Sequence, residues 1–474
     1  MSRAMLSIGW ATRDITPDRP ALIQGQKHRR IGRSALDPLT VTAWVFDGRR
    51  GRRLEHDAAD TDVAVIVSCD LAFPSDALYA EVRSAVADRL PDVPPDAVVL
   101  CATHTHTSMV FEDGLYPMPE DEAVMTPGEC RHLIAGRIVA AVEAAWKNRR
   151  PRRVRRSFCH AVVGHNRYAV YADGRARMYG KTNRDDFSHI GGYEDHSFDL
   201  LAVYEEAPPA DPRGVAPPAD QPAPSALCLV VPCPAQVDES LREFSADYWH
   251  EVRHVLRDAY GPELSVLGLC GAAGDQSPHL LLYRELEEEM RRRREVSERQ
   301  EIAERIASGV ARGLAGSSED MEPTLAHRRI STRLTPRAIT QDDRDLAERL
   351  YQEAVAAGDT DSWFPRRAKR VVDTFDGLRA AEPVPTELHV IRIGEMVVTT
   401  SPFELFLDYA LQVKARSAAK QTAVVQLAGR GFYLPTERAV RGGSYGAFPV
   451  VSAVGPRGGA ELVERILQEI GDLV

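Results

Sequence analysis

Residues 63–106 read VAVIVSCDLAFPSDALYAEVRSAVADRLPDVPPDAVVLCATHTH, and the succession of patterns within them indicates the fold class. Residues 63–67 are apolar and mostly β-branched, which is typical of a buried strand. Residues 75–90 carry apolar side chains at the four-residue spacing of a helix, and residues 97–101 form a second apolar run. A strand, a helix and a strand in this order predict a βαβ unit. We therefore expect an α/β protein in which mixed-strand sheets are flanked by helices.

Similar elements continue outward from this unit in both directions. Apolar runs predict further strands at residues 198–204, 226–231, 264–269 and 388–399, and helical spacing predicts helices at residues 133–146, 247–260 and 460–470. The Pro- and Ala-rich residues 208–224 predict a surface loop, and residues 283–313 predict a charged helical insertion, either solvated or in a dimer contact. Because no stretch resembles a long flexible linker, we expect one domain over residues 1–474.

Composition and charge exclude several classes of protein. The formal net charge of −10 argues against a nucleic-acid partner, since phosphate backbones are bound by clustered Lys and Arg. Two basic runs, residues 149–153 and 291–294, are interpreted as solvated surface. No apolar stretch approaches the roughly 20 residues that span a bilayer, so no integral membrane segment is expected. Scattered cysteines and an N-terminus unlike a secretory signal predict a cytoplasmic protein, with a homo-oligomer among the alternatives.

The motif Thr-His-Thr-His follows the second predicted strand of the βαβ unit, where ligands bind in open α/β sheets. His104 and His106 are two residues apart, so in a strand both would face the same crevice. Imidazole is the commonest protein ligand for zinc, which makes this pair a candidate metal and substrate site. Asp70 ends the neighbouring strand and is a candidate to orient a ligating histidine. The alternative is a pair of hydrogen-bonded histidines at a sheet edge.

Three later segments carry further reactive groups. The sequence LCGAAGDQSPH at residues 269–279 offers Ser277 as a nucleophile or hydrogen-bond donor, and its small residues would leave backbone N–H groups near Gly274 open to an oxyanion. Glu404 follows a strand and is either a metal ligand or a helix N-terminal carboxylate. Tyr433 and Tyr445 offer phenols to a metal or an oxyanion, although buried tyrosines are also common in cores.

Taken in order, these segments resemble the neutral (non-lysosomal) ceramidase family. The resemblance rests on residues 9–17 (GWATRDITP), 103–106 (THTH), 166–167 (NR), 245–248 (SADY), 274–278 (GDQSP), 402–404 (PFE) and 433–436 (YLPT). It covers nearly the whole chain and implies the catalytic domain of that family without its C-terminal β-sandwich. It also implies zinc-dependent hydrolysis of an N-acyl amide bond in a small-molecule substrate.

The resemblance implies a role for each matching residue. His104, Glu404 and Tyr433 would bind Zn²⁺, and His106 and Arg167 would face the substrate. Ser277 would be the catalytic serine, and Tyr445 matches a tyrosine that helps to stabilise the oxyanion. Zinc would polarise the scissile carbonyl, water or Ser277 would attack it, and His106 would pass a proton to the leaving amine.

The sequence departs from the family at the second zinc-binding histidine. The matching segment, residues 231–236, reads VPCPAQ, which places Cys233 at that position. A thiolate is a good zinc ligand, so we expect Cys233 to complete the metal site unless another histidine replaces it. His165, His189 and His196 are the candidates for that replacement. Because the chain has no evident lipid-facing patch, we expect a more polar N-acyl substrate than ceramide.

Two other hypotheses compete with the ceramidase-like one. Residues 250–254, HEVRH, match the H-E-x-x-H motif, so His250 and His254 would bind zinc and Glu251 would act as the base of a zincin peptidase. The simpler interpretation of this segment is an amphipathic helix. The second hypothesis is a non-catalytic scaffold that has lost the usual histidine and binds a partner through residues 283–313.

Overall fold

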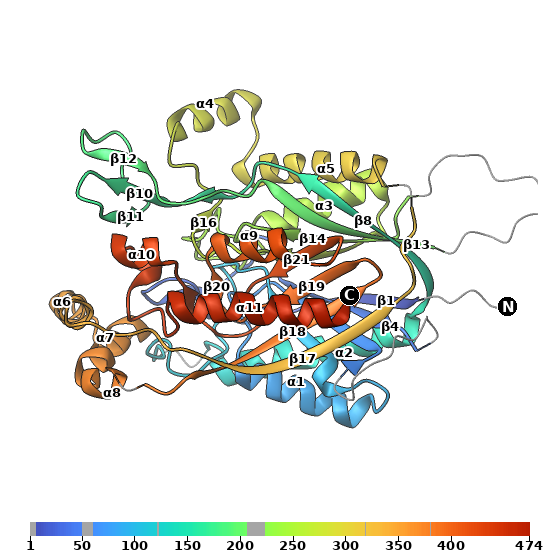
Figure 1. Cartoon of the computed structure of the whole chain (residues 1–474), viewed down its shortest axis with the longest axis horizontal. Coiled ribbons are helices and arrows are strands. Elements are labelled where there is room, and N and C mark those ends of the chain that lie inside the picture. The colour runs from blue at the N-terminus through green and yellow to red at the C-terminus, as the bar shows by residue number, and fades with distance from the viewer. Residues whose placement is uncertain (1–5, 50–59, 121–122, 206–222, 318, 380) are drawn as a thin grey trace, which may run out of the picture.

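The computed structural model describes residues 6–49, 60–120, 123–205, 223–317, 319–379 and 381–474 (Figure 1). Most of the predicted Pro- and Ala-rich loop, residues 208–222, lies outside these residues. Two β-sheets and their covering helices account for most of the described chain.

The larger sheet has eight strands in the described part of the chain. Their order is β15 (Ser265–Cys270), β14 (Ala226–Val231), β13 (Ser197–Glu205), β8 (Arg150–His160), β1 (Leu6–Asp14), β4 (Thr40–Asp47), β6 (Val63–Cys69) and β7 (Val98–Ala102). β6 pairs with β7, and β14 with β15, in parallel, whereas the other neighbours are antiparallel. The sheet curves on itself, so that its end strand β15 lies against β4, β6 and β7, and the Ser68 hydroxyl of β6 donates to the Gly268 carbonyl of β15 at 2.5 Å.

The second sheet packs face to face against the first. Its order is β21 (Gln421–Val425), β19 (Met396–Thr400), β18 (Val384–Ile393), β17 (Leu325–Leu334) and β5 (Asp60–Thr61). A shared hydrophobic core fills the space between the sheets, with Trp44 and Ile66 from the first sheet and Ile391 and Val398 from the second. Each sheet therefore has one face in this core and one face available for helices.

Helices cover both outer faces and complete four layers. α1 (Asp76–Arg89) and α2 (Pro127–Asn148) pack on the half of the large sheet that contains β4, β6 and β7, and α3 (Tyr248–Tyr260) and α5 (Glu298–Ala315) pack on the half that contains β13–β15. α9 (Leu407–Arg416) and α11 (Pro456–Leu473) cover the smaller sheet, and Figure 1 shows α11 in front of it. The remaining helices are α4 (Arg284–Arg294), α6 (Gln341–Ala356), α7 (Trp363–Asp373), α8 (Phe375–Arg379) and α10 (Glu437–Gly442).

Short strands lie near the ends of these sheets. They are β2 (Ala21–Ile23), β3 (Arg30–Gly32), β9 (His165–Asn166), β10 (Tyr168–Tyr171), β11 (Ala176–Met178), β12 (Phe187–Ile190), β16 (Gln276–Ser277), β20 (Glu404–Leu405) and β22 (Tyr433–Leu434). Two of their pairings matter for function, because β9 pairs with β16 and β20 pairs with β22.

The predicted α/β class and the βαβ unit are confirmed. β6, α1 and β7 follow one another as expected, and the Ser75 side chain caps α1 by accepting from the Leu78 N–H at 3.2 Å. The interpretation of residues 149–153 as solvated surface holds only in part, because Arg150 and Pro151 are exposed but residues 150–153 belong to the interior strand β8. Arg152 is buried, its Nε donates to Glu205 Oε1 at 3.3 Å, and its guanidinium lies 3.9 Å from the centre of the Trp10 ring, so a carboxylate and an aromatic face compensate the charge.

Residues 283–313 contain α4 and most of α5, which differ in their environment. α4 buries none of its side chains, whereas α5 packs Ile302, Ile306 and Val310 into the core beneath β8 and β13. The second half of this charged stretch is therefore part of the core. Within the described residues, no helix combines the length and the apolar character needed to cross a bilayer.

Candidate active site

A cavity of about 380 Å³ lies where loops from both sheets meet. The loop after β7 contributes His104 and His106, the segment after β19 contributes Glu404, and the segment after β21 contributes Phe432 and Tyr433. The sheets are joined at this point because the Ala102 N–H donates to the Leu427 carbonyl at 3.2 Å. Residues that are hundreds of positions apart in the sequence therefore share one pocket.

The His104 ring is held in one orientation. Its Nδ1 donates to the Ala72 carbonyl oxygen at 2.6 Å, so Nε2 is left to face Glu404 Oε2 at 3.4 Å. The backbone at His104 has φ of +66°, outside the strand conformation. The two histidines thus face the same pocket through a turn after β7, and strand alternation is not the reason. Their ring centres lie 4.8 Å apart.

Glu404 and Tyr433 meet through backbone pairing. β20 and β22 are parallel, with Glu404 opposite Tyr433, and the two side chains are hydrogen-bonded. Arg167 Nη2 donates to Tyr433 Oη at 3.0 Å and to the Gly274 carbonyl at 2.8 Å. Burial opposes ionisation of Glu404, but the hydrogen bond and charge of His104 outweigh burial and lower its pKa. An imidazole, a carboxylate, a phenol and a guanidinium therefore converge.

His106 is bound on both ring nitrogens. Its Nδ1 donates to Glu239 Oε2 at 3.2 Å, and its Nε2 accepts from Gln236 Nε2 at 2.8 Å. Burial lowers the pKa of His106, which favours the neutral ring. Burial raises the pKa of Glu239, but His106 outweighs this and brings it to about 2. Sequence reasoning missed both Gln236 and Glu239, and their only signal was their place after the strand at residues 226–231.

Unusual backbone conformations concentrate at this pocket. Among the described non-glycine residues with positive φ, four line the cavity: His104, Tyr179, Leu427 and Phe432. Such conformations cost about 1–3 kcal/mol each and persist where the surrounding structure imposes them, often at functional sites.

Ser277 and Tyr445 occupy different positions relative to the cavity. Tyr445 lines it and packs against Tyr433, with ring centres 5.7 Å apart. Ser277 is fully buried behind Tyr179, which donates from its hydroxyl to Ser277 Oγ at 3.2 Å. The predicted opening for an oxyanion near Gly274 is wrong, because the Gly274 N–H donates to the Leu405 carbonyl at 2.8 Å.

The structure does not bring Cys233 to the cavity. Its Sγ lies 3.7 Å from the Val163 carbonyl and 3.5 Å from the Pro234 carbonyl, within the core beneath α3. Burial raises the pKa of this thiol, which opposes the thiolate form that binds metal. Asp70 does not orient a histidine either. It accepts from both terminal nitrogens of Arg253, at 2.8 and 2.9 Å.

The zincin motif lies on α3, away from this cavity. The His250 and His254 rings are 4.4 Å apart, but Glu251 pairs with Arg299 at 3.4 Å and His254 is exposed. Among the described residues, no His, Cys, Asp or Glu joins the two histidines in a cluster of three metal-ligand atoms. The geometry thus favours the amphipathic-helix interpretation.

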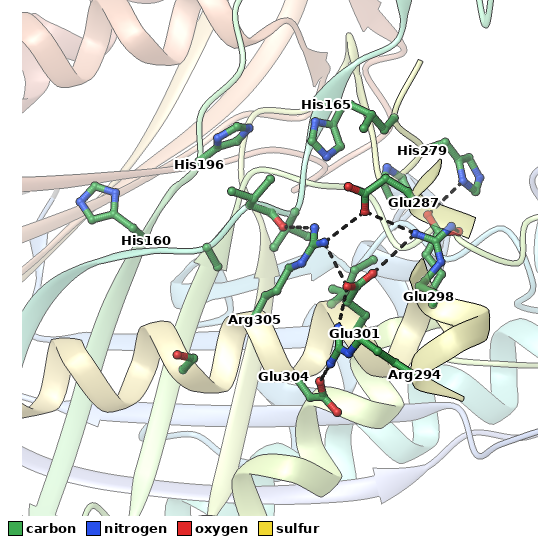
Figure 2. Close-up of a pocket in the computed structure, with 18 of the residues that line it drawn as sticks. His160, His165, His196, His279, Glu287, Arg294, Glu298, Glu301, Glu304 and Arg305 are labelled. Carbon is green, nitrogen blue, oxygen red and sulfur yellow. Dashed lines mark hydrogen bonds and ion pairs between the residues drawn. The ribbon is translucent and has the colours of Figure 1, made fainter. Parts of the chain in front are cut away.

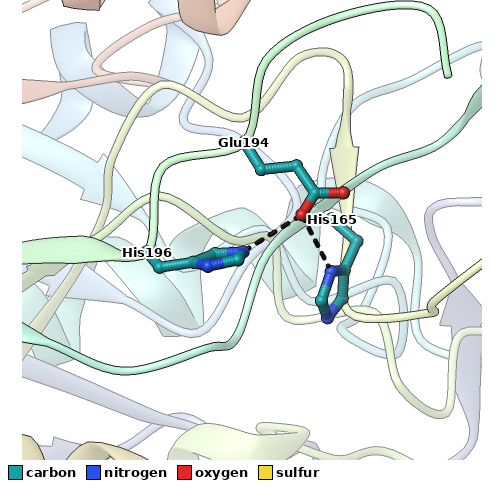
Figure 3. A group of neighbouring side chains, drawn as sticks. All are labelled: His165, Glu194 and His196. Atoms are coloured by element: carbon teal, nitrogen blue, oxygen red, sulfur yellow. Dashed lines mark hydrogen bonds and ion pairs between the residues drawn. The ribbon is translucent and has the colours of Figure 1, made fainter.

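A second cluster of metal-ligand type does exist, formed by His165, Glu194 and His196 (Figure 3). His165 and His196 line a different cavity, of about 640 Å³, together with His160 and His279 (Figure 2). His189, the third candidate to replace Cys233, is exposed and contacts Ser188. None of the three candidate histidines lines the cavity that contains His104.

Solved structures of known proteins share the fold of this chain. No model of a known protein family matches the chain, and no curated protein sequence matches it. The neutral ceramidase from Pseudomonas aeruginosa matches with a TM-score of 0.69 and 15% identity, over 100% of this chain and 75% of that one. A ceramidase complexed with C2 matches with a TM-score of 0.66 and 14% identity, over 99% of this chain and 75% of that one. The chain therefore has the fold of the neutral ceramidases.

Proposed function

We propose that this protein is a zinc-dependent hydrolase that cleaves the N-acyl amide bond of a small polar or amphiphilic substrate. The observation that carries the proposal is the convergence of His104, Glu404 and Tyr433 on one wall of a cavity that His106 also lines. The likeness in fold to neutral ceramidases supports the reaction class.

The residues present fit a zinc ion. Imidazole nitrogen and carboxylate oxygen are zinc ligands, and a ligating histidine typically donates its other ring N–H to a carbonyl, as His104 does to Ala72. Gln236 Oε1 is buried and has no hydrogen-bond partner among the described residues. We assign His104, Glu404 and Tyr433 as the candidate ligands, and Gln236, which contacts His106 but does not line the cavity, to holding that ring. Zinc bound there would supply a Lewis acid that polarises the scissile carbonyl and acidifies water.

His106 acts as the proton carrier in this proposal. Burial lowers the pKa of His106 and favours the neutral ring, whose Nε2 lone pair accepts from the Gln236 amide. In this proposal Nε2 exchanges that hydrogen bond for the proton of the attacking water. Glu239, bound to Nδ1, then stabilises the positive ring that forms. His106 next returns the proton to the leaving amine, while Arg167 and Tyr445 face the negative charge on the carbonyl oxygen.

Ser277 has a positioning role in this scheme. Because its hydroxyl is buried and held by Tyr179, the attacking group is water, and Ser277 fixes the Tyr179 side chain against the cavity. Tyr179 in turn lies beside Arg167, with which it is hydrogen-bonded.

The lining of the cavity supports an amphiphilic substrate. Phe73, Tyr116, Trp363 and Phe432 give it an apolar wall suited to an acyl chain. Gln24 also lines it, and both polar atoms of its side chain are buried without a partner among the described residues. A buried amide without a hydrogen-bond partner lowers the stability of the fold unless a ligand supplies that partner. We therefore propose that Gln24 forms a hydrogen bond with a polar group of the substrate.

The test combines metal analysis with hydrolysis of a panel of N-acyl amines and N-acyl amino acids. We expect His104→Ala to lose both the active-site metal and activity, and Glu404→Gln to do the same. His250→Ala is the control, because its histidine belongs to the zincin motif, and it should keep both. Full activity and full metal content in His104→Ala would refute the proposal. A pure, folded protein that binds no zinc and cleaves no substrate would favour the scaffold hypothesis.

A further inference from the structure

We propose that His165, Glu194 and His196 bind a second divalent transition-metal ion of the zinc class, separate from the active site. The three side chains come from β9 and from the segment that leads into β13, and they point toward one another (Figure 3). Two imidazoles and one carboxylate are a ligand set that zinc accepts, with a fourth position left for water.

The spacing of the ligand atoms matches a tetrahedral ion. Glu194 Oε2 lies 3.3 Å from His165 Nδ1 and 3.1 Å from His196 Nε2, and all three ligand atoms lie within 4.8 Å of one another. Ligands at about 2.0–2.2 Å from a tetrahedral zinc ion lie roughly 3.3–3.5 Å apart. The two distances from Glu194 are within about 0.4 Å of this spacing, and the two histidine nitrogens lie no more than 4.8 Å apart, so the rings must adjust around the carboxylate to accept an ion.

Contacts around the cluster hold its ligands in place. Glu194 Oε1 accepts from the Asn166 N–H at 3.1 Å, which leaves Oε2 for the two histidines. The His196 ring is also hydrogen-bonded to the backbone of Gly164. Metal-ligating groups typically have such outer partners, which fix the ring and carboxylate orientation.

The site has an open approach. His165 is buried, whereas the His196 side chain is 38% exposed and lines the cavity of Figure 2 with His160. An ion and its water can thus reach the cluster from solvent without passing through the active-site cavity. None of the three residues lines that cavity.

A metal ion here would hold together the segment next to the active site. β9 pairs with β16, with His165 opposite Ser277, and the Arg167 N–H donates to the Asp275 carbonyl at 3.0 Å. An ion bound by His165, Glu194 and His196 would fasten residues 194–196 to this pair of strands. The role assigned to the second ion is therefore structural.

The experiment counts metal ions on the full chain after loading with zinc and desalting, with cobalt absorption as a second readout. We expect one fewer ion per chain in His196→Ala and in Glu194→Gln than in the wild type. His196 is partly exposed and Glu194→Gln preserves volume, so both variants should fold. His160→Ala is the control, because it lines the same cavity without belonging to the cluster, and it should retain every ion.

The outcome is separable from that of the proposed active site. His104→Ala and His196→Ala should each remove one ion, and the double variant should remove both. If only His196→Ala removes an ion, the second site stands and the active-site metal does not. If His196→Ala and Glu194→Gln both keep the wild-type metal content and cobalt spectrum, the second site is refuted.

Discussion

Gly25→Ala should disable the active site while leaving the fold intact. Gly25 has φ of +109°, and a Cβ placed on it would lie 2.5 Å from both Cβ and Cγ of His106 and 2.7 Å from its Cα. Carbon atoms normally approach to about 3.5–4.0 Å, so His106 must move by roughly 1 Å. A displacement of about 1 Å in a catalytic group costs on the order of 100-fold in rate. We therefore expect kcat to fall by about 100-fold while the metal at His104 is retained.

Gly261→Ala provides a matched control for this substitution. Gly261 has φ of +112°, and a Cβ there meets no atom within 4 Å. Both variants carry similar backbone strain, and Gly25→Ala adds the clash with His106, so it should lose about 1–3 kcal/mol more free energy of unfolding than Gly261→Ala, which denaturant titration measures. Only Gly25→Ala should lose hydrolysis of an N-acyl amide that the wild type cleaves. If both variants are equally active, the reasoning about His106 is wrong.

Three further outcomes are expected. Ser277→Ala should lower kcat only about fivefold, the equivalent of one hydrogen bond of roughly 1 kcal/mol, whereas a loss on the order of 10⁶-fold would identify a nucleophile. Asp70→Asn leaves the buried Arg253 charge unpaired and should lower the free energy of unfolding by about 3–5 kcal/mol in a denaturant titration, and a loss under about 1 kcal/mol would contradict this. Burial and the neighbouring His389 lower the pKa of His327 to about 3, below its unfolded value. As the pH falls below about 6.5, the unfolded chain binds a proton at His327 and the folded chain does not, which lowers the free energy of unfolding by about 2 kcal/mol at pH 5. In His327→Gln, the free energy of unfolding measured by denaturant titration should therefore fall less steeply between about pH 6.5 and pH 5 than in the wild type.

The sequence was sufficient for elements whose signal is local. β6, α1 and β7 each have a continuous pattern, and their pairing follows from the βαβ rule, so the α/β class was predictable. The sequence did not predict β8, because its many arginines are typical of a solvated surface and not of an interior strand. Arg152 is tolerated there because Glu205 and Trp10, both far away in the sequence, pair with and cover its guanidinium.

The candidate site was predictable only in part, and Cys233 shows why. Matching along the sequence placed this residue at the expected metal position, but it says nothing about which way a side chain turns. In the structure the loop after β14 turns the thiol into the core and presents Gln236 to His106. Glu239 was missed for the same reason, since its role depends on a contact with a residue 133 positions away.

The sequence by itself determined the α/β class, the βαβ unit, part of the main strands and helices, and the reactive residue types, because these depend on local periodicity and on short motifs. The tertiary structure decided which of those residues meet. Parallel pairing of β20 with β22 joins Glu404 to Tyr433, and the turn after β7 brings His104 to them. A separate pairing places His165 opposite the buried Ser277, and His165 lines another cavity. Such meetings depend on packing between distant segments, and no local pattern encodes that packing.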